Sequence, residues 1–172
     1  FMDSPHSTQT DLIFEPVEIA ALWSIQGSRE SSLSNFETAL FDASAGIGSM
    51  LHSTPLRLLR LWPHQAYLLA DKQPMPASVY EFESYMTDIS DGYCEFRLSG
   101  GQAFDFIANY LTADPAKSDP GSACLRCRLG HYVVILWWEH RHQLQLLVER
   151  SYAQSFTDYI ESLIARWRPE NP

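Results

Sequence analysis

The chain has 172 residues, of which 45% are apolar, 13% are aromatic and 19% are charged, and its formal net charge is −9. This length suits one domain, or two small lobes that share a core. The excess of acidic residues argues against nucleic acid or an anionic membrane as the main ligand, because both are bound by clustered Lys and Arg, and no apolar run approaches the ~20 residues that span a bilayer.

The first part of the chain predicts a small lobe that follows a flexible end. Residues 1–15 are expected to be a flexible N-terminal segment, since residues 2–10 are polar. Residues 16–74 predict a β-α-β-β lobe, with a helix from Ser34 or Asn35 as N-cap to about Ser44. Its strands are expected at Ile19–Ile25, Leu56–Leu61 and Ala66–Ala70. The run Asp71–Ala77 (D-K-Q-P-M-P-A) predicts a linker, because proline neither continues a helix nor donates to a strand ladder.

Residues 75–172 predict a second lobe. Helices are expected from Ala103 to about Leu111, and from Ser151 as N-cap to about Trp167. The expected strands are Tyr85–Ile89, Tyr93–Leu98, Cys124–Leu129, Tyr132–Trp138 and Gln143–Glu149. The order of elements in the two lobes indicates an α+β fold with helices packed on antiparallel sheets.

The cysteines give no sign of a secreted, disulfide-bonded protein. Three cysteines cannot all pair, and buried free thiols are the simpler interpretation. No basic-then-apolar signal sequence opens the chain, so we expect a cytoplasmic protein.

The cysteines suggest two kinds of site, a metal centre and a catalytic Cys–His pair, and the sequence supports neither. Cys124 and Cys127, followed by His140 and His142, superficially resemble a zinc finger, but the histidines are two residues apart instead of three to five. Residues three apart on a strand also point to opposite faces. Catalysis by a Cys–His pair has no supporting local signature.

The turn Ser99–Gly101 lies between a predicted strand and a predicted helix. Backbone N–H groups there could hold an anion, but neither a dinucleotide fingerprint nor a Walker lysine is present. A tight strand-to-helix turn is the simpler interpretation.

The adjacent residues Trp137 and Trp138 are candidates for a protein interface. Neighbouring strand residues point to opposite faces, so one Trp is expected in the core and the other outside. An outward Trp beside His140, Arg141 and His142 could anchor a partner, or it could cover a sheet edge.

Asp114 is a candidate ligand-binding residue. It follows Leu111-Thr112-Ala113 at the end of the predicted helix, where a carboxylate could accept hydrogen bonds from a pterin ring. An Asp before Pro115 also commonly begins a turn.

Several short motifs occur in a specific order. They are Asp88-Ile89-Ser90, Ser99-Gly100 with Ala103, Leu111-Thr112 with Asp114, Pro120-Gly121, the strand Gln143–Val148, and E-R-S-Y-A ending at Ala153. Together they resemble the folate-binding half-domain of the glycine-cleavage T-protein (aminomethyltransferase). The ending E-R-S-Y-A and the segment L-R-L-W-P-H-Q-A-Y-L-L, which ends at Leu69, look more like the gamma subunit of heterotetrameric sarcosine oxidase, although Trp62 replaces a glycine and Tyr67 a tryptophan.

The resemblance covers about residues 19–167 and implies a two-lobed, T-protein-like fold. It further implies a non-catalytic gamma-like subunit of a complex that oxidatively demethylates an N-methyl amine and passes the one-carbon unit to tetrahydrofolate. FAD, FMN, NAD and tetrahydrofolate would lie on partner subunits of alpha-like, beta-like and delta-like kind, and none would be bound by this chain alone. The alternative is a free-standing folate-binding domain. Asp114 matches the position of the T-protein's catalytic aspartate, but the chain is about half the length of a full T-protein.

Overall fold

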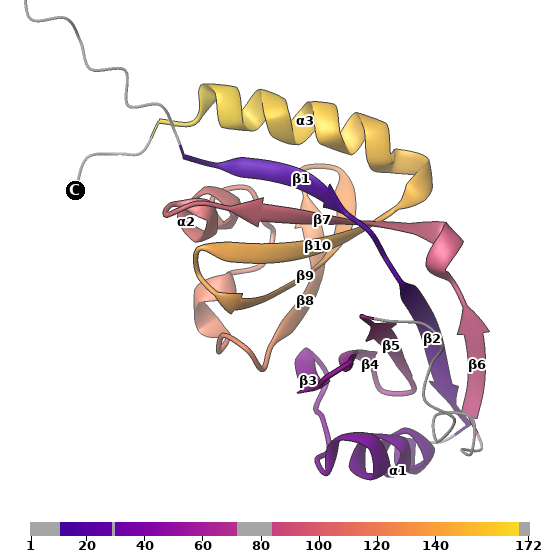
Figure 1. Cartoon of the computed structure of the whole chain (residues 1–172). Helices are drawn as coiled ribbons and strands as arrows, with labels where there is room; N and C mark the ends of the chain where they lie inside the picture. The colour runs from indigo at the N-terminus through magenta and orange to yellow at the C-terminus, as the bar shows by residue number, and fades with distance from the viewer. Residues whose placement is uncertain (1–10, 29, 72–83, 169–172) are drawn as a thin grey trace, which may run out of the picture.

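The computed structural model describes residues 11–28, 30–71 and 84–168. Within them, ten strands form two five-stranded antiparallel sheets, which confirms the α+β class (Figure 1). Sheet A has the strand order β1-β7-β10-β9-β8, and sheet B has the order β3-β4-β5-β2-β6. The strands of sheet A are β1 (Ile13–Val17), β7 (Tyr93–Ser99), β8 (Cys124–Leu129), β9 (Tyr132–His140) and β10 (Gln143–Glu149). The strands of sheet B are β2 (Ala21–Gly27), β3 (Ser49–Ser53), β4 (Leu56–Trp62), β5 (Gln65–Ala70) and β6 (Ser84–Asp88).

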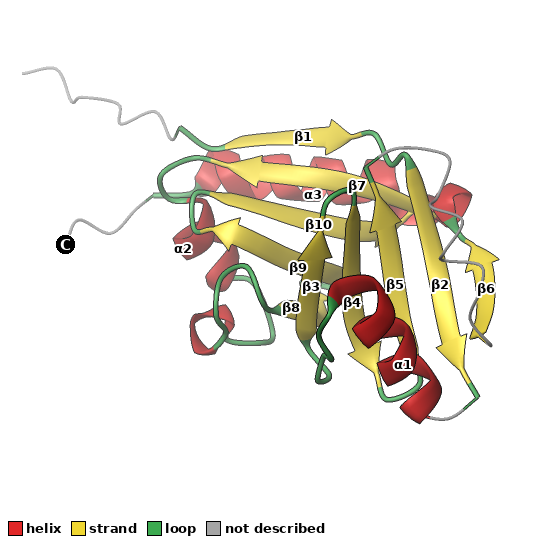
Figure 2. Ribbon diagram, turned by 60° about the horizontal axis from the view of Figure 1, so that its bottom comes forward, coloured by secondary structure: helices red, strands yellow, loops and turns green. Residues whose placement is uncertain are grey.

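The sheets face each other, and helices cover their outer faces (Figures 1 and 2). Helices α2 (Ala103–Ala108) and α3 (Ala153–Arg166) pack on sheet A, while α1 (Glu30–Phe41) packs on sheet B. A third apolar cluster joins the inner faces, with Trp137 and Ile135 of sheet A against Leu22 and Leu59 of sheet B. None of the described helices is long and apolar enough to cross a membrane.

Each sheet contains one strand from the other half of the chain. Strand β1 pairs with β7, from Ile13 opposite Ser99 to Val17 opposite Glu95, and β6 pairs with β2. The expected boundary between lobes at residues 74 and 75 is therefore wrong for these two strands. The expectation of a flexible segment is also wrong for residues 13–15, because Phe14 stacks on Phe96 with ring centroids 4.9 Å apart. Residues 1–10 and most of the expected linker (72–77) lie outside the described part.

Three further boundaries differ from the sequence prediction. Helix α1 begins at Glu30, four residues before Ser34. The helix at Ala103 ends at Ala108, and Ser151 lies in a 3-10 turn, η4 (Arg150–Tyr152), ahead of α3. Strand β3 was not predicted, because five residues with the sequence S-M-L-H-S carry too weak an alternation to be recognised alone.

The prediction that one of Trp137 and Trp138 faces outward is wrong, since both are fully buried. Their side chains do point to opposite faces of β9. Trp138 packs in the cluster beneath the helices, where its ring meets Phe104, and Trp137 packs between the two sheets. Sheet A is covered on both sides at this strand, so neither residue is a candidate interface anchor.

A buried ion pair fixes α1 to sheet B. The Arg60 guanidinium on β4 donates to the Glu37 carboxylate on α1, and both side chains are almost fully excluded from solvent. Arg60 also donates to the carbonyl oxygens of Trp62 (3.0 Å) and Pro63 (2.6 Å), and the second Glu37 oxygen accepts from the Ala45 N–H at 3.0 Å. These bonds satisfy both buried charges, as burial requires.

Removing one member of this pair should strongly destabilise the protein. Glu37→Gln or Arg60→Met leaves an uncompensated buried charge, and we expect a loss of about 3–5 kcal/mol in the free energy of unfolding, measured with urea. The control Glu15→Gln breaks the more exposed pair with Arg97 and should cost less than about 1 kcal/mol. Losses below about 1 kcal/mol for both single variants at the buried pair would contradict this account.

Candidate functional site

The motif Asp88-Ile89-Ser90 lies where the chain crosses between the sheets. The Asp88 carboxylate accepts hydrogen bonds from the hydroxyl (2.6 Å) and the N–H (2.9 Å) of Ser90, and these bonds lower the pKa of Asp88. The Ser90 hydroxyl oxygen in turn accepts from the Leu22 N–H at 2.9 Å. The Ile89 N–H donates to the Leu22 carbonyl, also at 2.9 Å. The motif therefore fastens the β6–β7 crossover to the first residues of β2.

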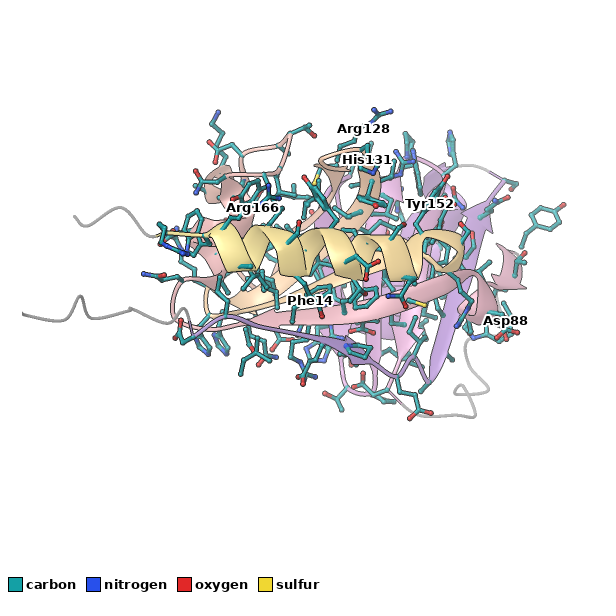
Figure 3. The ribbon with its side chains drawn as sticks, turned by 90° about the horizontal axis from the view of Figure 1, so that it is seen from above. Phe14, Asp88, Arg128, His131, Tyr152 and Arg166 are labelled. Atoms are coloured by element: carbon teal, nitrogen blue, oxygen red, sulfur yellow. The ribbon has the colours of Figure 1, made fainter. Side chains whose placement is uncertain are left out.

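The E-R-S-Y-A motif meets the same crossover. Arg150 donates through Nε to the Asp91 carbonyl at 2.6 Å, and through a terminal nitrogen to the Tyr93 carbonyl at 3.1 Å. In Figure 3, Tyr152 marks the start of α3, and Asp88 lies toward the same end of the molecule, with Arg166 at the other. Two motifs that are 60 residues apart in sequence thus contact each other at the β6–β7 crossover.

Asp114 lies on the surface in the geometry of a turn. Its carboxylate accepts from the Ala116 N–H at 3.0 Å and lies 3.6 Å from the Lys117 ammonium nitrogen. It caps the 3-10 turn η3 (Pro115–Lys117), and 52% of its side chain is exposed. It lines neither of the two larger cavities described below.

The turn Ser99–Gly101 already has an anionic partner. The Gly101 N–H donates to the Asp11 carboxylate at 2.9 Å. Gly100 has a φ of +133°, and a Cβ atom built on it would lie 2.7 Å from the Asp11 carbonyl oxygen, so the turn requires glycine there. The geometry is that of a strand-to-helix turn.

Cys124 and Cys127 form neither a metal site nor a reactive thiol. Cys124 is buried and its thiol donates to the Ser49 carbonyl, while Cys127 is half-buried. Burial raises the pKa of Cys124 to about 12 and that of Cys127 to about 11, so both thiols stay protonated near neutral pH. His140 and His142 stack on each other, and no group of three or more potential metal ligands occurs among the described residues.

Trp62 and Tyr67, the two departures from the gamma-subunit pattern, lie in an aromatic pocket between the sheets. The Arg126 guanidinium lies over the Trp62 ring at 5.1 Å, and the Tyr67 and Tyr93 hydroxyls are 2.9 Å apart. Burial and this hydrogen bond raise the pKa of Tyr67. The cavity here measures about 60 Å³, far below the size of ordinary ligand sites.

A polar groove of about 320 Å³ lies at the other end of the space between the sheets. Sheet A supplies polar side chains from β7, β9 and β10, sheet B supplies Arg57, and residues 17–21, where the chain passes from β1 to β2, form one wall. The charged and amide side chains that line it are Glu18, Arg57, Asp71, Glu95, Arg97, Glu139, Gln143 and Gln145. The face of sheet A that points toward sheet B therefore has two parts. It carries apolar side chains where the two sheets are packed together, and polar side chains where it lines the groove.

Several polar groups in the groove have no hydrogen-bond partner although water barely reaches them. These are the Nε–H groups of Arg57 and Arg97 and the amide oxygen of Gln145. Each arginine does use a terminal nitrogen, because Arg57 contacts Glu139 and Arg97 contacts Glu15, both at 3.2 Å. Buried polar groups are nearly always paired, so these three atoms mark the groove as the candidate site.

Glu95 is the most perturbed carboxyl group of the groove. Burial raises its pKa to about 7, although Arg57 and Arg97 act in the opposite direction. Such a shift in a concave site is typical of functional carboxyl groups. Glu95 and its neighbours were not predicted from the sequence, where their one signal is the alternation of charged residues with Phe96 and Leu98 on β7.

A second cavity of about 580 Å³ adjoins the groove at the same crossover. It shares residues 17–19 and Glu95 with the groove and is otherwise lined by residues including Tyr93, Phe96 and Ala153. Its volume falls within the range of small-molecule sites, ~300–1,000 Å³.

No protein-family model matches this sequence, and no curated protein matches it. Solved structures do match. A chain of the heterotetrameric sarcosine oxidase from Corynebacterium sp. U-96, solved in complex with pyrrole 2-carboxylate, aligns with a TM-score of 0.77 and 15% identity, covering 94% of this chain and 87% of that one. The glycine cleavage system aminomethyltransferase T from Bartonella henselae aligns with a TM-score of 0.62 and 14% identity, covering 88% of this chain and 45% of that one.

The chain thus has the T-protein-like α+β fold that the motifs predicted. More particularly, it has the fold of a sarcosine oxidase chain over almost the whole length of both molecules. It spans about half of the aminomethyltransferase.

The raised pKa of Glu95 should appear in the pH dependence of stability. Because the folded state holds a proton that the unfolded state releases near pH 4.5, the contribution of Glu95 to stability is full below pH 4.5 and is lost as the pH rises to about 7. We expect Glu95→Gln to remove this decline, so that the variant gains stability relative to the wild type between pH 5 and pH 8 in urea unfolding.

The control is Glu161→Gln, which removes one charge from the exposed side of α3. Its difference from the wild type corrects for the change in net charge. If the curves for Glu95→Gln and Glu161→Gln have the same shape, Glu95 is not a desolvated carboxyl group.

Proposed function

We propose that this chain is a non-catalytic, gamma-like subunit of a sarcosine-oxidase-type flavoenzyme complex. The complex would oxidatively demethylate an N-methyl amine and pass the one-carbon unit to tetrahydrofolate. The observation that carries the proposal is the alignment with a sarcosine oxidase chain, which covers 94% of this chain and 87% of that one. The alignment covers 87% of the sarcosine oxidase chain but only 45% of the aminomethyltransferase, which favours the likeness to the sarcosine oxidase chain.

The partners in this proposal are large alpha-like and beta-like subunits and a small delta-like subunit. FAD, FMN, NAD and tetrahydrofolate would be bound by those partners. Within this chain, burial raises the pKa values of Cys124 and Cys127, and Asp114 caps an exposed turn, so neither these two thiols nor this carboxylate is placed as a nucleophile.

The unpaired edge strands are the surfaces best suited to hold a partner. Among the described residues, β6 is an edge strand of sheet B that pairs with β2, and it carries Tyr85, which is 73% exposed. In sheet A, β1 is an edge strand that carries the exposed Ile13. Free strand edges with large exposed apolar side chains are normally protected in a protein that acts alone, so a partner is expected to cover them.

A pull-down from the native organism, with this chain as bait and partners identified by mass spectrometry, tests the proposal. We expect stoichiometric recovery of large flavin-binding subunits. We also expect Tyr85→Lys to reduce the recovery at least tenfold, because it places a charge on the edge of β6. The control Asp158→Lys, on the exposed side of α3, should leave recovery unchanged. Recovery of the bait alone would refute the proposal.

A second candidate function is a free-standing folate-binding domain. The observation that favours it is the 580 Å³ cavity, together with a fold shared with an aminomethyltransferase. Calorimetric titration with tetrahydrofolate tests it on the isolated chain. We expect Ala153→Met, which narrows the cavity, to weaken any such binding at least tenfold.

The same titration tests Asp114 as a folate contact. Because Asp114 lies outside the cavity, binding there should be unchanged in Asp114→Ala. A loss of affinity in Asp114→Ala, with none in Ala153→Met, would instead assign the ligand to the η3 turn that Asp114 caps. Absence of millimolar binding would eliminate this second function.

A further inference from the structure

The polar groove has unused hydrogen-bonding capacity of both kinds. The Nε–H groups of Arg57 and Arg97 are donors without an acceptor, and the Gln145 oxygen is an acceptor without a donor. These atoms come from β4, β7 and β10, so both sheets contribute to one cavity. Leaving them unpaired costs free energy that a ligand with complementary groups would restore.

The charges in the groove are also mixed. Two arginines and four carboxyl groups (Glu18, Asp71, Glu95 and Glu139) line it. One terminal nitrogen of Arg57 already contacts Glu139, and one of Arg97 contacts Glu15, which is outside the lining. The lining is therefore net acidic, although its unpaired donors belong to cations.

This combination excludes ligands with a single charge. A simple anion would pair with the arginine Nε–H groups but would be repelled by the surrounding carboxylates. A simple cation would be attracted by the carboxylates but would leave both Nε–H groups buried without an acceptor. A molecule that carries an acceptor anion and a donor cation a few ångströms apart satisfies both sets of groups.

We infer that the groove binds a small α-amino acid as its zwitterion. The carboxylate accepts hydrogen bonds from the Nε–H groups of Arg57 and Arg97, and the ammonium donates to the Gln145 oxygen and the Glu95 carboxylate. The cavity volume of about 320 Å³ suits a small ligand of this class. This binding is independent of the partner complex, and the Glu95 carboxyl, with a pKa of about 7, gains a counter-ion that favours its charged form.

The test is an NMR titration of the full-length isolated chain with glycine, L-alanine and L-proline, in which the arginine Nε–H signals are observed. We expect at least one of these amino acids to move the Arg57 and Arg97 Nε–H signals in a saturable way. Propionate, which lacks the ammonium, and ethylamine, which lacks the carboxylate, are matched to L-alanine and should bind at least tenfold more weakly.

Two variants assign the contacts. Gln145→Leu removes the acceptor and Arg97→Lys removes the Nε–H donor, and each should weaken binding at least tenfold. Arg166→Lys, at the exposed end of α3, is the control and should bind like the wild type. If a groove variant fails to fold, the titration of the wild-type protein still tests the inference.

Three results would overturn the inference. The first is an absence of saturable shifts with all three amino acids. The second is equal binding of L-alanine and propionate, or of L-alanine and ethylamine. The third is a set of shifts that leaves the Arg57 and Arg97 Nε–H signals in place.

Discussion

The pairing of strands across the two halves of the chain is the constraint on which this structure depends. Strand β1 completes sheet A and β6 completes sheet B, so each half of the chain contributes one strand to the other's sheet. The hydrogen bonds of Ile89 and Ser90 to Leu22 fix the β6–β7 crossover to the start of β2. The polar groove and the larger cavity both lie against the β1–β2 crossover, so their walls exist only because the strands are exchanged.

Local patterns were sufficient to predict most elements of the fold. The spacing of apolar residues in α3 and their alternation in β7 and β10 predicted a helix and two strands, and these elements occur in the structure. Trp137 and Trp138 show where such patterns fail. Alternation correctly placed them on opposite faces, but whether the second face meets water depends on sheet B, which is brought there by distant pairing. Strand β3 likewise could not be predicted from its own five residues, because it forms by pairing with β4.

The groove is less predictable than the fold for a related reason. Glu95 and Arg97 on β7 have the spacing of a solvated strand face, and nothing near them in sequence indicates that Arg57, about 40 residues earlier, completes an enclosure. By contrast, Asp114 stood in a recognisable motif, yet its carboxylate caps a turn on the surface. The order and spacing of the motifs predicted the fold because they follow the order of strands and helices along the chain. The groove could not be predicted in this way, because its side chains come from strands that are far apart in the sequence.

The exchange of β1 and β6 has a consequence for how the molecule could be divided. A chain cut between β5 and β6 would give two fragments that each carry a strand belonging to the sheet of the other. Neither fragment could complete its own sheet, and each would present an open edge that only its counterpart fits. The two pieces would therefore behave as obligate, interlocked partners rather than as independent modules, so this architecture resists being separated or recombined as two exchangeable units.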